Sequence, residues 1–258
     1  MKKLLLLIDI HNDYFRPGQS NSSGDQKELI LKFVLTNDDG YTAPGLAALI
    51  EVAGRLGQVI VVAPINAQSG VGHQVSMQTP LRVERSTQPN HYMVHGAPAD
   101  CTRLALKEIA SDADWVLSGI NQGANLGSDV YQSGTVAAAR EAAILGKKAI
   151  AVSQYIAPEW LVDWDAAVRY LSSVLPIVIN APLARGNFWN INLPSPITAD
   201  SPIKWQYCPL DKNPHKYRFR KDGDLYYYQG VIHDRPRAAR SDVDICFSGN
   251  VSITRVEI

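Results

Sequence analysis

The chain has 258 residues, of which 46% are hydrophobic and 19% charged, so it can bury the core of one large domain and is not expected to be disordered. Its 25 basic and 25 acidic residues give a formal net charge of zero, which argues against a nucleic-acid polymer or a membrane as partner and favours small molecules. Three widely separated cysteines, Cys101, Cys208 and Cys246, argue against a disulfide framework or a thiolate zinc site and fit a reducing cytoplasm.

Residues 1–30 differ in pattern from the rest of the chain, and we interpret them as an N-terminal extension. Residues 4–10 predict a strand, and residues 11–25 are rich in Asn, Asp, Pro, Gly and Ser, as loops and linkers are. The basic start leads into an apolar run that is cut by Asp9 and has no small-residue cleavage site. Neither a signal peptide nor a membrane span is therefore expected.

Beyond this extension, apolar strands alternate with helices. Residues 33–36 predict a strand, Pro44 suits the first turn of a helix with apolar residues at helical spacing, and Gly57 stands where that helix would end. Residues 59–63 predict a second, continuously apolar strand. This order is typical of a parallel sheet that is covered by helices on both faces and connected by right-handed crossovers.

The alternation continues after a long loop, residues 64–80, which is rich in Gly, Ser and Gln. The pattern then predicts strands at residues 115–117 and 149–153 and helices at residues 136–145 and 164–174. A Tyr- and Arg-rich stretch at residues 215–240 predicts a hairpin or extended arm. We therefore expect an extension at residues 1–30 followed by one α/β domain at residues 31–258, with its arm at about residues 215–240.

Asp38 and Asp39 are the most informative residues, because they come directly after the first predicted core strand. Adjacent carboxylates there repel each other and lose hydration unless a cation or a proton compensates. Both can reach one ion only if the chain turns, which Gly40 permits. Oxygen ligands without His or thiolate favour Mg²⁺ or Mn²⁺, and Asn121, after the strand at residues 115–117, is a candidate further ligand. The alternative is a polar turn with an Asx cap.

Ser133, Gly134 and Thr135 precede the Ala-rich helix predicted at residues 136–145. The free N–H groups of a helix N-terminus can bind a phosphate, although a simple Ser or Thr cap is the alternative for this tripeptide alone. A carboxylate pair, an Asn-rich loop at residues 118–125 and an anion-binding helix start together favour chemistry on phosphate esters.

These motifs, taken in order, resemble the SurE family, the survival-protein nucleotidases. The resemblance depends on Asn37-Asp38-Asp39-Gly40-Tyr41 with Ala43-Pro44-Gly45, Ser69-Gly70, Pro98-Ala99-Asp100-Cys101, Ser118-Gly119-Ile120-Asn121 with Gly123, Asn125 and Gly127, and Ser133-Gly134-Thr135-Val136. The ordered set spans about residues 31–153, and a weaker likeness that includes residues 242–244 runs to the C-terminus. The extension of about thirty residues departs from the family pattern.

The resemblance implies a Rossmann-like, doubly wound domain with a mainly parallel sheet. It further implies hydrolysis of nucleoside 5′-monophosphates, with the 3′ position left open, and one divalent metal, Mg²⁺ or Mn²⁺. The implied metal ligands are Asp38, Asp39, Ser69 and Asn121, and Asn125 with residues 133–135 would face the phosphate. Homodimers or homotetramers that exchange the C-terminal arm are also implied. Ser69 is implicated by the resemblance alone, because a Ser in a long loop is usually a solvated hydroxyl.

The hypothesis for the reaction is in-line displacement at phosphorus by metal-activated water, with Asp38 and Asp39 as the catalytic, ion-holding pair and the helix start at Ser133 stabilising the transition state. A covalent aspartyl-phosphate is the mechanistic alternative. His73 in the long loop is a candidate general acid, but a structural or exposed histidine is the favoured interpretation. Lys107, Arg140 and the basic residues of the arm could meet phosphate or be surface charges.

Three other functions are weighed against this one. Haloacid-dehalogenase-type phosphatases place Asp-x-Asp-Gly-Thr after their first strand, but that alignment puts Asn37 at the nucleophile position, where an amide cannot attack phosphorus. Residues 7–15 are similar to the opening of isochorismatase-like hydrolases, whose Lys and nucleophilic Cys are not found in their contexts here. The third alternative is a module that binds nucleotides without hydrolysing them.

Overall fold

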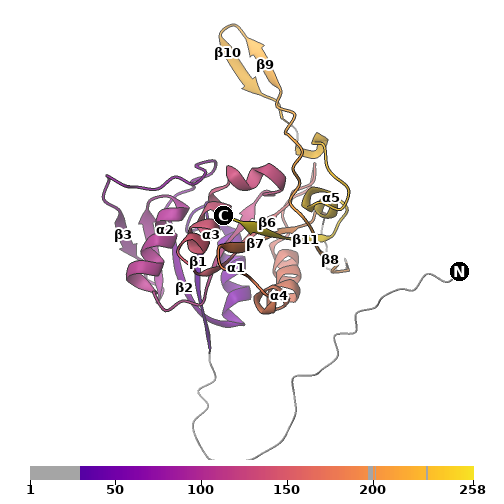
Figure 1. The fold of residues 1–258 in the computed structure, drawn as a ribbon. Coiled ribbons are helices and arrows are strands. Elements are labelled where there is room, and N and C mark those ends of the chain that lie inside the picture. The colour runs from indigo at the N-terminus through magenta and orange to yellow at the C-terminus, as the bar shows by residue number, and fades with distance from the viewer. Residues whose placement is uncertain (1–29, 197–199, 201, 231) are drawn as a thin grey trace, which may run out of the picture.

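The computed structural model describes residues 30–196, 200, 202–230 and 232–258. The strand predicted at residues 4–10 and the loop predicted after it lie outside these ranges. A nine-stranded sheet in the order β3-β4-β2-β1-β5-β6-β7-β11-β8 forms the centre of the fold (Figure 1). Its strands are β1 (Leu31–Thr36), β2 (Gly57–Pro64), β3 (Arg82–Arg85), β4 (His91–His95), β5 (Trp115–Gln122), β6 (Lys148–Gln154), β7 (Asn187–Leu193), β8 (Trp205–Tyr207) and β11 (Val251–Glu257).

The sheet is mainly parallel, as the sequence predicts. Among the neighbouring strands described in this nine-stranded sheet, only the β3·β4 and β7·β11 pairs are antiparallel. After β1 the chain adds β2 on one side, and it later returns to add β5 on the other side of β1. Strand order therefore reverses at β1 and β5, and in such sheets ligands bind beyond the carboxyl ends of the strands at this point.

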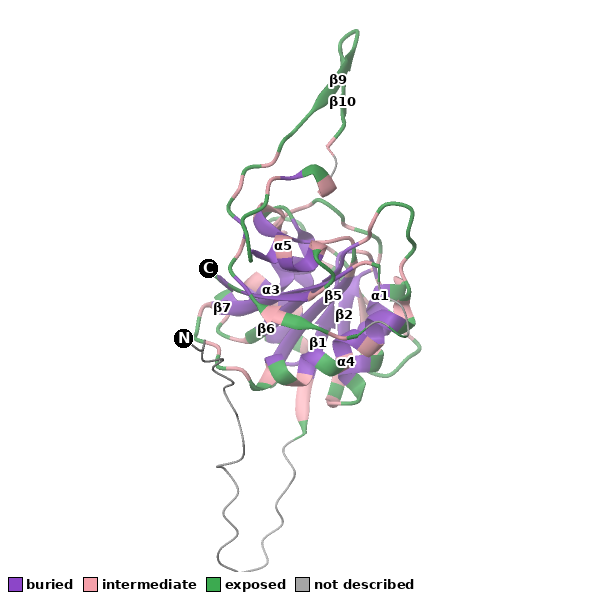
Figure 2. Ribbon diagram, turned by 90° about the vertical axis from the view of Figure 1, so that its right-hand side faces the viewer, coloured by how far each residue is buried: buried purple, intermediate pink, exposed green. Residues whose placement is uncertain are grey.

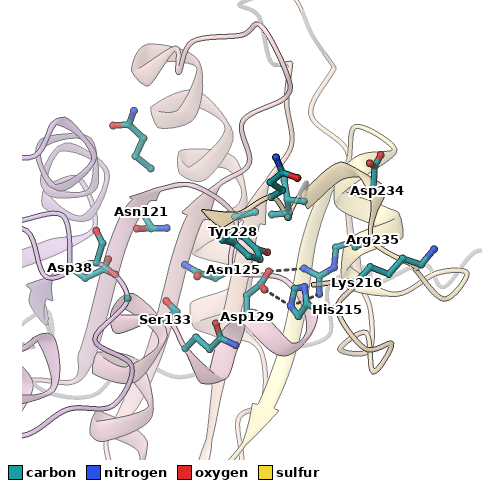
Figure 3. Close-up of a pocket in the computed structure, with 18 of the residues that line it drawn as sticks. Asp38, Asn121, Asn125, Asp129, Ser133, His215, Lys216, Tyr228, Asp234 and Arg235 are labelled. Atoms are coloured by element: carbon teal, nitrogen blue, oxygen red, sulfur yellow. Dashed lines mark hydrogen bonds and ion pairs between the residues drawn. The ribbon is translucent and has the colours of Figure 1, made fainter. Parts of the chain in front are cut away.

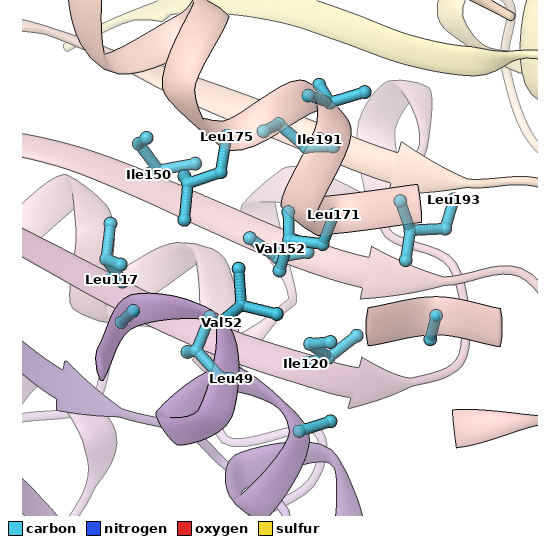
Figure 4. Packing of buried hydrophobic residues seen from close by; sticks show 14 of the residues in the cluster. Leu49, Val52, Leu117, Ile120, Ile150, Val152, Leu171, Leu175, Ile191 and Leu193 are labelled. Atoms are coloured by element: carbon cyan, nitrogen blue, oxygen red, sulfur yellow. The ribbon is translucent and has the colours of Figure 1, made fainter. Parts of the chain in front are cut away.

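Helices cover both faces of the sheet. One hydrophobic cluster lies under α1 (Pro44–Gly54) and α4 (Trp164–Asn180), and a second lies under α2 (Pro98–Leu104) and α3 (Gly134–Ile144). In β1, Phe33 and Leu35 belong to the first cluster and Val34 to the second, so the continuously apolar strand is buried on both sides. Figure 4 shows part of the first cluster, in which Leu49, Val52, Leu171 and Leu175 of the helices face Leu117, Ile120, Ile150, Val152, Ile191 and Leu193 of the strands.

The third predicted strand is longer than expected. The sequence predicted a strand at residues 115–117 and a loop from Ser118, but β5 continues to Gln122. Its pairing with β6 is interrupted after Ser118 and resumes at Asn121, so the polar stretch still contributes to the sheet. Gly119, whose φ is +139°, lies in the irregular part, where a side chain would be strained. Asn121 is therefore held at the end of a strand.

Two helix boundaries also differ from the prediction. α1 ends at Gly54, and Gly57 is already the first residue of β2. α4 does not stop at Val174 but runs to Asn180 through Pro176. Buried residues of its last turns, including Leu175 and Val178, pack into the first cluster, and this packing outweighs the helix-breaking tendency of proline.

The predicted arm is a hairpin that projects from the body of the protein (Figure 1). Its strands are β9 (Phe219–Asp222) and β10 (Leu225–Tyr228), and every residue in them is exposed (Figure 2). The elements that the sequence did not predict are β3, β4, α2, β7, β8, α5 (Asp242–Phe247), β11, a π-helical turn at Ala105–Ile109, and 3-10 turns at Gly127–Tyr131 and Ile232–Asp234. Within the described part of the chain, no helix combines the length and the apolar character that crossing a membrane requires.

Candidate active site

A cavity of about 440 Å³ opens at the carboxyl ends of β1 and β5, next to the base of the arm (Figure 3). Six of the eight predicted site residues line it, namely Asp38, Asp39, Ser69, Asn121, Asn125 and Ser133. Four segments far apart in the sequence contribute these side chains: the turn after β1, the loop after β2, the end of β5 with the loop after it, and the start of α3. The other two predicted residues, Gly134 and Thr135, lie directly behind Asp38.

A turn immediately after β1 brings both aspartates to the cavity. Gly40 has a φ of +97°, and the Asn37 side chain closes the turn by donating from Nδ2 to the Gly40 carbonyl over 2.8 Å. Asp38 is only 4% exposed, whereas Asp39 is half-buried. The turn that was predicted to let neighbouring carboxylates face one site is thus present.

Each aspartate has one oxygen bound by the protein. Oδ1 of Asp38 accepts a hydrogen bond from the Thr135 hydroxyl, and Oδ2 of Asp39 accepts one from the Gln122 N–H over 3.0 Å. Among the described residues, no side chain binds the other oxygen of either carboxylate, although the Thr135 N–H also lies near Asp38 and lowers its pKa. One oxygen on each aspartate is therefore available to a ligand in the cavity.

The protein environment disfavours negative charge on this pair. Burial raises the pKa of Asp38 to about 6, although the Thr135 hydrogen bond acts against this shift and the charge of Asp39 adds to it. Burial likewise raises the pKa of Asp39, against the hydrogen bond from Gln122. Two carboxylates with raised pKa values and no cationic partner among the described residues are a suitable binding site for a cation.

Ser69 and Asn121 supply two further oxygen atoms. The Asn121 side chain donates from Nδ2 to the Gly123 carbonyl over 2.8 Å, so this hydrogen bond orients the amide and leaves Oδ1 for the cavity. Ser69 comes after Gln68, whose N–H donates to the Asp38 carbonyl over 2.7 Å. Carboxylate, amide and hydroxyl oxygens without sulfur or imidazole form a donor set that fits Mg²⁺ or Mn²⁺.

The residues at the helix start, 133–135, contact either the cavity or Asp38. Ser133 lines the cavity and also caps α3, because its Oγ accepts a hydrogen bond from the Val136 N–H over 3.1 Å. Thr135 donates its hydroxyl to Asp38, and Gly134 packs against the same carboxylate. Two residues of the tripeptide that was expected to meet phosphate therefore contact Asp38.

Asn125 is buried and is held by side chains of β6 and β7. Its N–H donates to Oδ1 of Asn192 over 2.8 Å, and its Nδ2 donates to Oγ of Ser153 over 2.8 Å. Its carbonyl accepts from the Nδ2 atoms of Asn190, at 2.8 Å, and Asn192, at 3.1 Å. Among the described residues no partner binds its Oδ1, so this network fixes Asn125 and leaves one polar atom free at the cavity wall.

The base of the arm supplies residues that the sequence did not reveal. Asp129 on the cavity wall accepts from Arg235 Nη1 over 2.6 Å and lies 2.8 Å from His215 Nε2 (Figure 3). The Arg235 side chain is 3% exposed and also donates to the Leu126 carbonyl over 3.1 Å. The sequence did not predict these pairs. Asp129 is about a hundred residues away from its partners, and both partners belong to a stretch that was described only as an arm with basic residues.

Asp242, part of the weaker family likeness, supports this wall from behind. Its carboxylate accepts hydrogen bonds from the N–H groups of Gly127, at 2.7 Å, and Asp211, at 2.8 Å. Burial raises its pKa, although these backbone donors act in the opposite direction. Asp242 therefore joins the loop after β5 to the segment that leads into the arm.

Of the histidine and the basic residues that the sequence offered as candidates, only basic residues of the arm line the cavity. His73 does not line the cavity, and its Nε2 lies 2.8 Å from Oε2 of Glu141, in agreement with the structural interpretation. Lys107 and Arg140 also lie outside the cavity, whereas Lys216 and Arg218 of the arm line it.

Comparisons with known proteins agree with this geometry. The family model described as Survival protein SurE matches residues 33–216. A relative from Synechocystis sp., provisionally named a 5′-nucleotidase, is 42% identical over 228 residues, which are 88% of this chain and all of that relative. The 5′-nucleotidase SurE of Rhodopirellula baltica is 39% identical over 233 residues, 87% of this chain and 91% of that protein. The crystal structure of the SurE protein from Aquifex aeolicus superposes with a TM-score of 0.78 at 33% identity and covers 88% of this chain and 93% of that one.

Proposed function

The chain belongs to the SurE family, and from this membership and the cavity we propose that it is a phosphomonoesterase that hydrolyses nucleoside 5′-monophosphates with the help of one divalent metal ion. The names of the relatives support the 5′-nucleotidase activity. Hydrolysis of 3′-monophosphates is a further activity to test. Family membership also argues against the haloacid-dehalogenase and isochorismatase alternatives.

The observation that carries the proposal is the aspartate pair with one unbound oxygen on each residue. The free oxygens of Asp38 and Asp39, Oδ1 of Asn121 and the hydroxyl of Ser69 would hold the metal. When bound, Mg²⁺ or Mn²⁺ supplies positive charge that balances the phosphoryl oxygens and makes the attacking water more acidic. Thr135 and the Gln122 N–H keep the two carboxylates in place for this role.

Other residues on the cavity wall would bind the phosphate and the nucleoside. The N-terminus of α3 lies at the cavity beside Ser133, and the N–H groups of a helix N-terminus can stabilise phosphoryl oxygens and the negative charge of the transition state. Asn125 offers its free Oδ1 to a hydroxyl of the phosphate or the sugar. Lys216 and Arg218 place cations at the arm side of the cavity. We further propose a homodimer or homotetramer in which the exposed hairpin contacts a second copy of the chain.

Phosphate release from adenosine and guanosine monophosphates, with and without Mn²⁺, tests the proposal. We expect metal-dependent release by the wild type, and a loss of about a thousandfold or more in Asp38→Asn and Asp39→Asn. Binding of these nucleotides without release would instead support a non-catalytic binding module. If chemical trapping during turnover captured a phosphorylated Asp38 or Asp39, the aspartyl-phosphate mechanism would replace direct attack by water.

A further inference from the structure

We propose that Glu141, acting through His73, is a positioning residue that fixes the loop carrying Ser69 and so sets the affinity of the site for its metal ion. The inference deepens the proposed function and rests on it, because it takes Ser69 as one of the ligands. Neither Glu141 nor His73 lines the cavity. Their effect would therefore be transmitted through the loop between β2 and β3.

This loop has little structure of its own near Ser69. Residues 65–81 form no helix or strand, and the stretch after Ser69 contains two glycines with positive φ, Gly70 at +75° and Gly72 at +58°. A Cβ built on Gly70 would meet no atom within 4 Å, so no other part of the protein packs against that side of the glycine. Because glycine has many accessible conformations, the position of Ser69 depends on where the loop is attached on either side.

Hydrogen bonds on both sides of Ser69 attach the loop to segments that form the cavity. Before Ser69, the Gln68 N–H binds the Asp38 carbonyl over 2.7 Å, and after it the Gly72 N–H binds the Gln132 carbonyl over 3.1 Å. Both of these are single backbone hydrogen bonds. Farther on, Ser76 donates its N–H to Asp100 over 2.8 Å and its hydroxyl over 3.0 Å. His73 provides the side-chain attachment nearest to Ser69 among the hydrogen bonds described for the loop.

The attachment of His73 is charge-assisted, and its acceptor is buried. Glu141 is 1% exposed, and its two oxygens bind His73 Nε2 at 2.8 Å and Arg103 Nε at 2.6 Å. With Nε2 donating to Glu141, Nδ1 faces Nη1 of Arg140 at 3.4 Å, so residues of α3 contact the imidazole at both nitrogens. Burial raises the pKa of Glu141, but the donors His73 and Arg103 outweigh it and hold the pKa below its usual range. Charge-assisted hydrogen bonds of this kind are stronger than neutral ones.

The helix that holds His73 is the same helix that holds Asp38. α3 binds Asp38 through Thr135 near its first turn and binds the loop through Glu141 two turns later. The helix thus connects one proposed metal ligand rigidly to the loop that carries another. Removal of the His73 attachment would leave Asp38 in place and free Ser69 to move away from it.

The test uses His73 variants, because they leave the ion pair between Glu141 and Arg103 intact. His73→Ala removes the attachment, and His73→Gln keeps an N–H donor that can reach Glu141. His95→Ala is the matched control, because His95 of β4 forms the same kind of pair with Glu84 of β3, at 2.7 Å, in an exposed position. Mn²⁺ affinity is measured by direct titration, and hydrogen exchange of residues 65–81 is measured in the metal-free proteins.

We expect His73→Ala to bind Mn²⁺ at least tenfold more weakly than wild type, the range typical of groups that support metal ligands, with faster exchange in the loop. His73→Gln should recover to within about threefold of wild type, and His95→Ala should bind as wild type does. If His73→Ala matches His95→Ala in affinity while the wild type binds Mn²⁺ and releases phosphate, the inference is wrong and the proposed function stands. A wild type that neither binds Mn²⁺ nor releases phosphate would overturn both.

Discussion

Gly134 packs so closely against Asp38 that a Cβ added to the glycine would lie 2.9 Å from Cβ and 3.1 Å from Oδ2 of the aspartate. The first residue of α3 therefore sets how near the helix can come to the end of β1. Because Thr135 next to it donates to Oδ1 of the same carboxylate, the start of α3 fixes both the position and the orientation of Asp38.

Gly134→Ala should impair the site although alanine favours helices. The added methyl must displace Asp38 or the helix, and misplacing a catalytic group by about 1 Å can cost on the order of 100-fold in rate. We expect phosphate release to fall at least tenfold and Mn²⁺ binding to weaken. Gly54→Ala is the matched control, since a Cβ at this helical glycine meets no atom within 4 Å. That variant should keep full activity and gain up to about 1 kcal/mol in the free energy of unfolding; equal activity in the two variants would contradict the role of Gly134.

Thr135→Val should lower metal affinity with little change in shape. Valine is nearly isosteric with threonine but cannot donate to Asp38, and loss of a group that supports a metal ligand typically costs 10- to 100-fold in affinity or activity. Thr102→Val is the control, because the Thr102 hydroxyl donates to the Ala138 carbonyl over 3.2 Å, away from the cavity. Isothermal titration with Mn²⁺ measures both variants, and an unchanged affinity in Thr135→Val would show that the hydrogen bond does not support the ligand.

The raised pKa of Asp38 predicts how stability depends on pH in the metal-free protein. Between its ordinary pKa of 3.8 and its folded value of about 6, the folded protein retains a proton that the unfolded chain has lost. The contribution of Asp38 to the free energy of unfolding therefore falls as pH rises through this window. Well above pH 6, ionised Asp38 lowers the free energy of unfolding by on the order of 3 kcal/mol relative to the protonated form.

Asp38→Asn should remove the destabilisation that the buried, ionised carboxylate causes. In EDTA, we expect the variant to be more stable than wild type at pH 8, with a gap that shrinks as pH falls towards 4, as measured by urea unfolding. Asp112→Asn is the control, because its exposed carboxylate pairs with Lys32 and its pKa is lowered, chiefly by the hydrogen bond from Lys32. A gap for Asp38→Asn that stays constant from pH 5 to pH 8 would contradict the assigned pKa.

Arg235→Ala should destabilise the wall of the cavity at the base of the arm. The Arg235 side chain is buried, and its removal takes away one donor to the Leu126 carbonyl and leaves Asp129 with His215 as its remaining ion-pair partner. We expect a loss of about 2–4 kcal/mol in the free energy of unfolding, near the range for breaking a buried ion pair. Arg220→Ala removes an exposed ion pair with Asp222 in the hairpin and should change stability by less than about 1 kcal/mol. Equal losses in the two variants would show that the Asp129 pair contributes no more than a surface contact.

Those parts of the site that are formed by consecutive residues could be predicted from the sequence. The turn at Asp38 and Asp39 could be predicted because a buried strand, two carboxylates and Gly40 are consecutive, and its position in the sheet could be inferred from the strand-helix-strand pattern. The helix start at Ser133 was also readable from consecutive residues.

Contacts between distant segments could not be predicted in the same way. Asn125 is held by Asn190 and Asn192, and this contact depends on the register of β6 against β7, which no local pattern specifies. The pairing of Asp129 with Arg235 joins residues 106 positions apart. The extension of β5 to Gln122 was missed because the polar residues after Ser118 look like a loop, although the β6 strand still pairs with them.

The most direct test of the central claim is a crystal structure of the wild type soaked in Mn²⁺, with anomalous diffraction recorded to locate the ion. We predict one peak at the carboxyl ends of β1 and β5, within bonding distance of Asp38, Asp39, Asn121 and Ser69. A cavity without such a peak at saturating Mn²⁺, or an ion held by other residues, would contradict the proposal that this aspartate pair binds the metal.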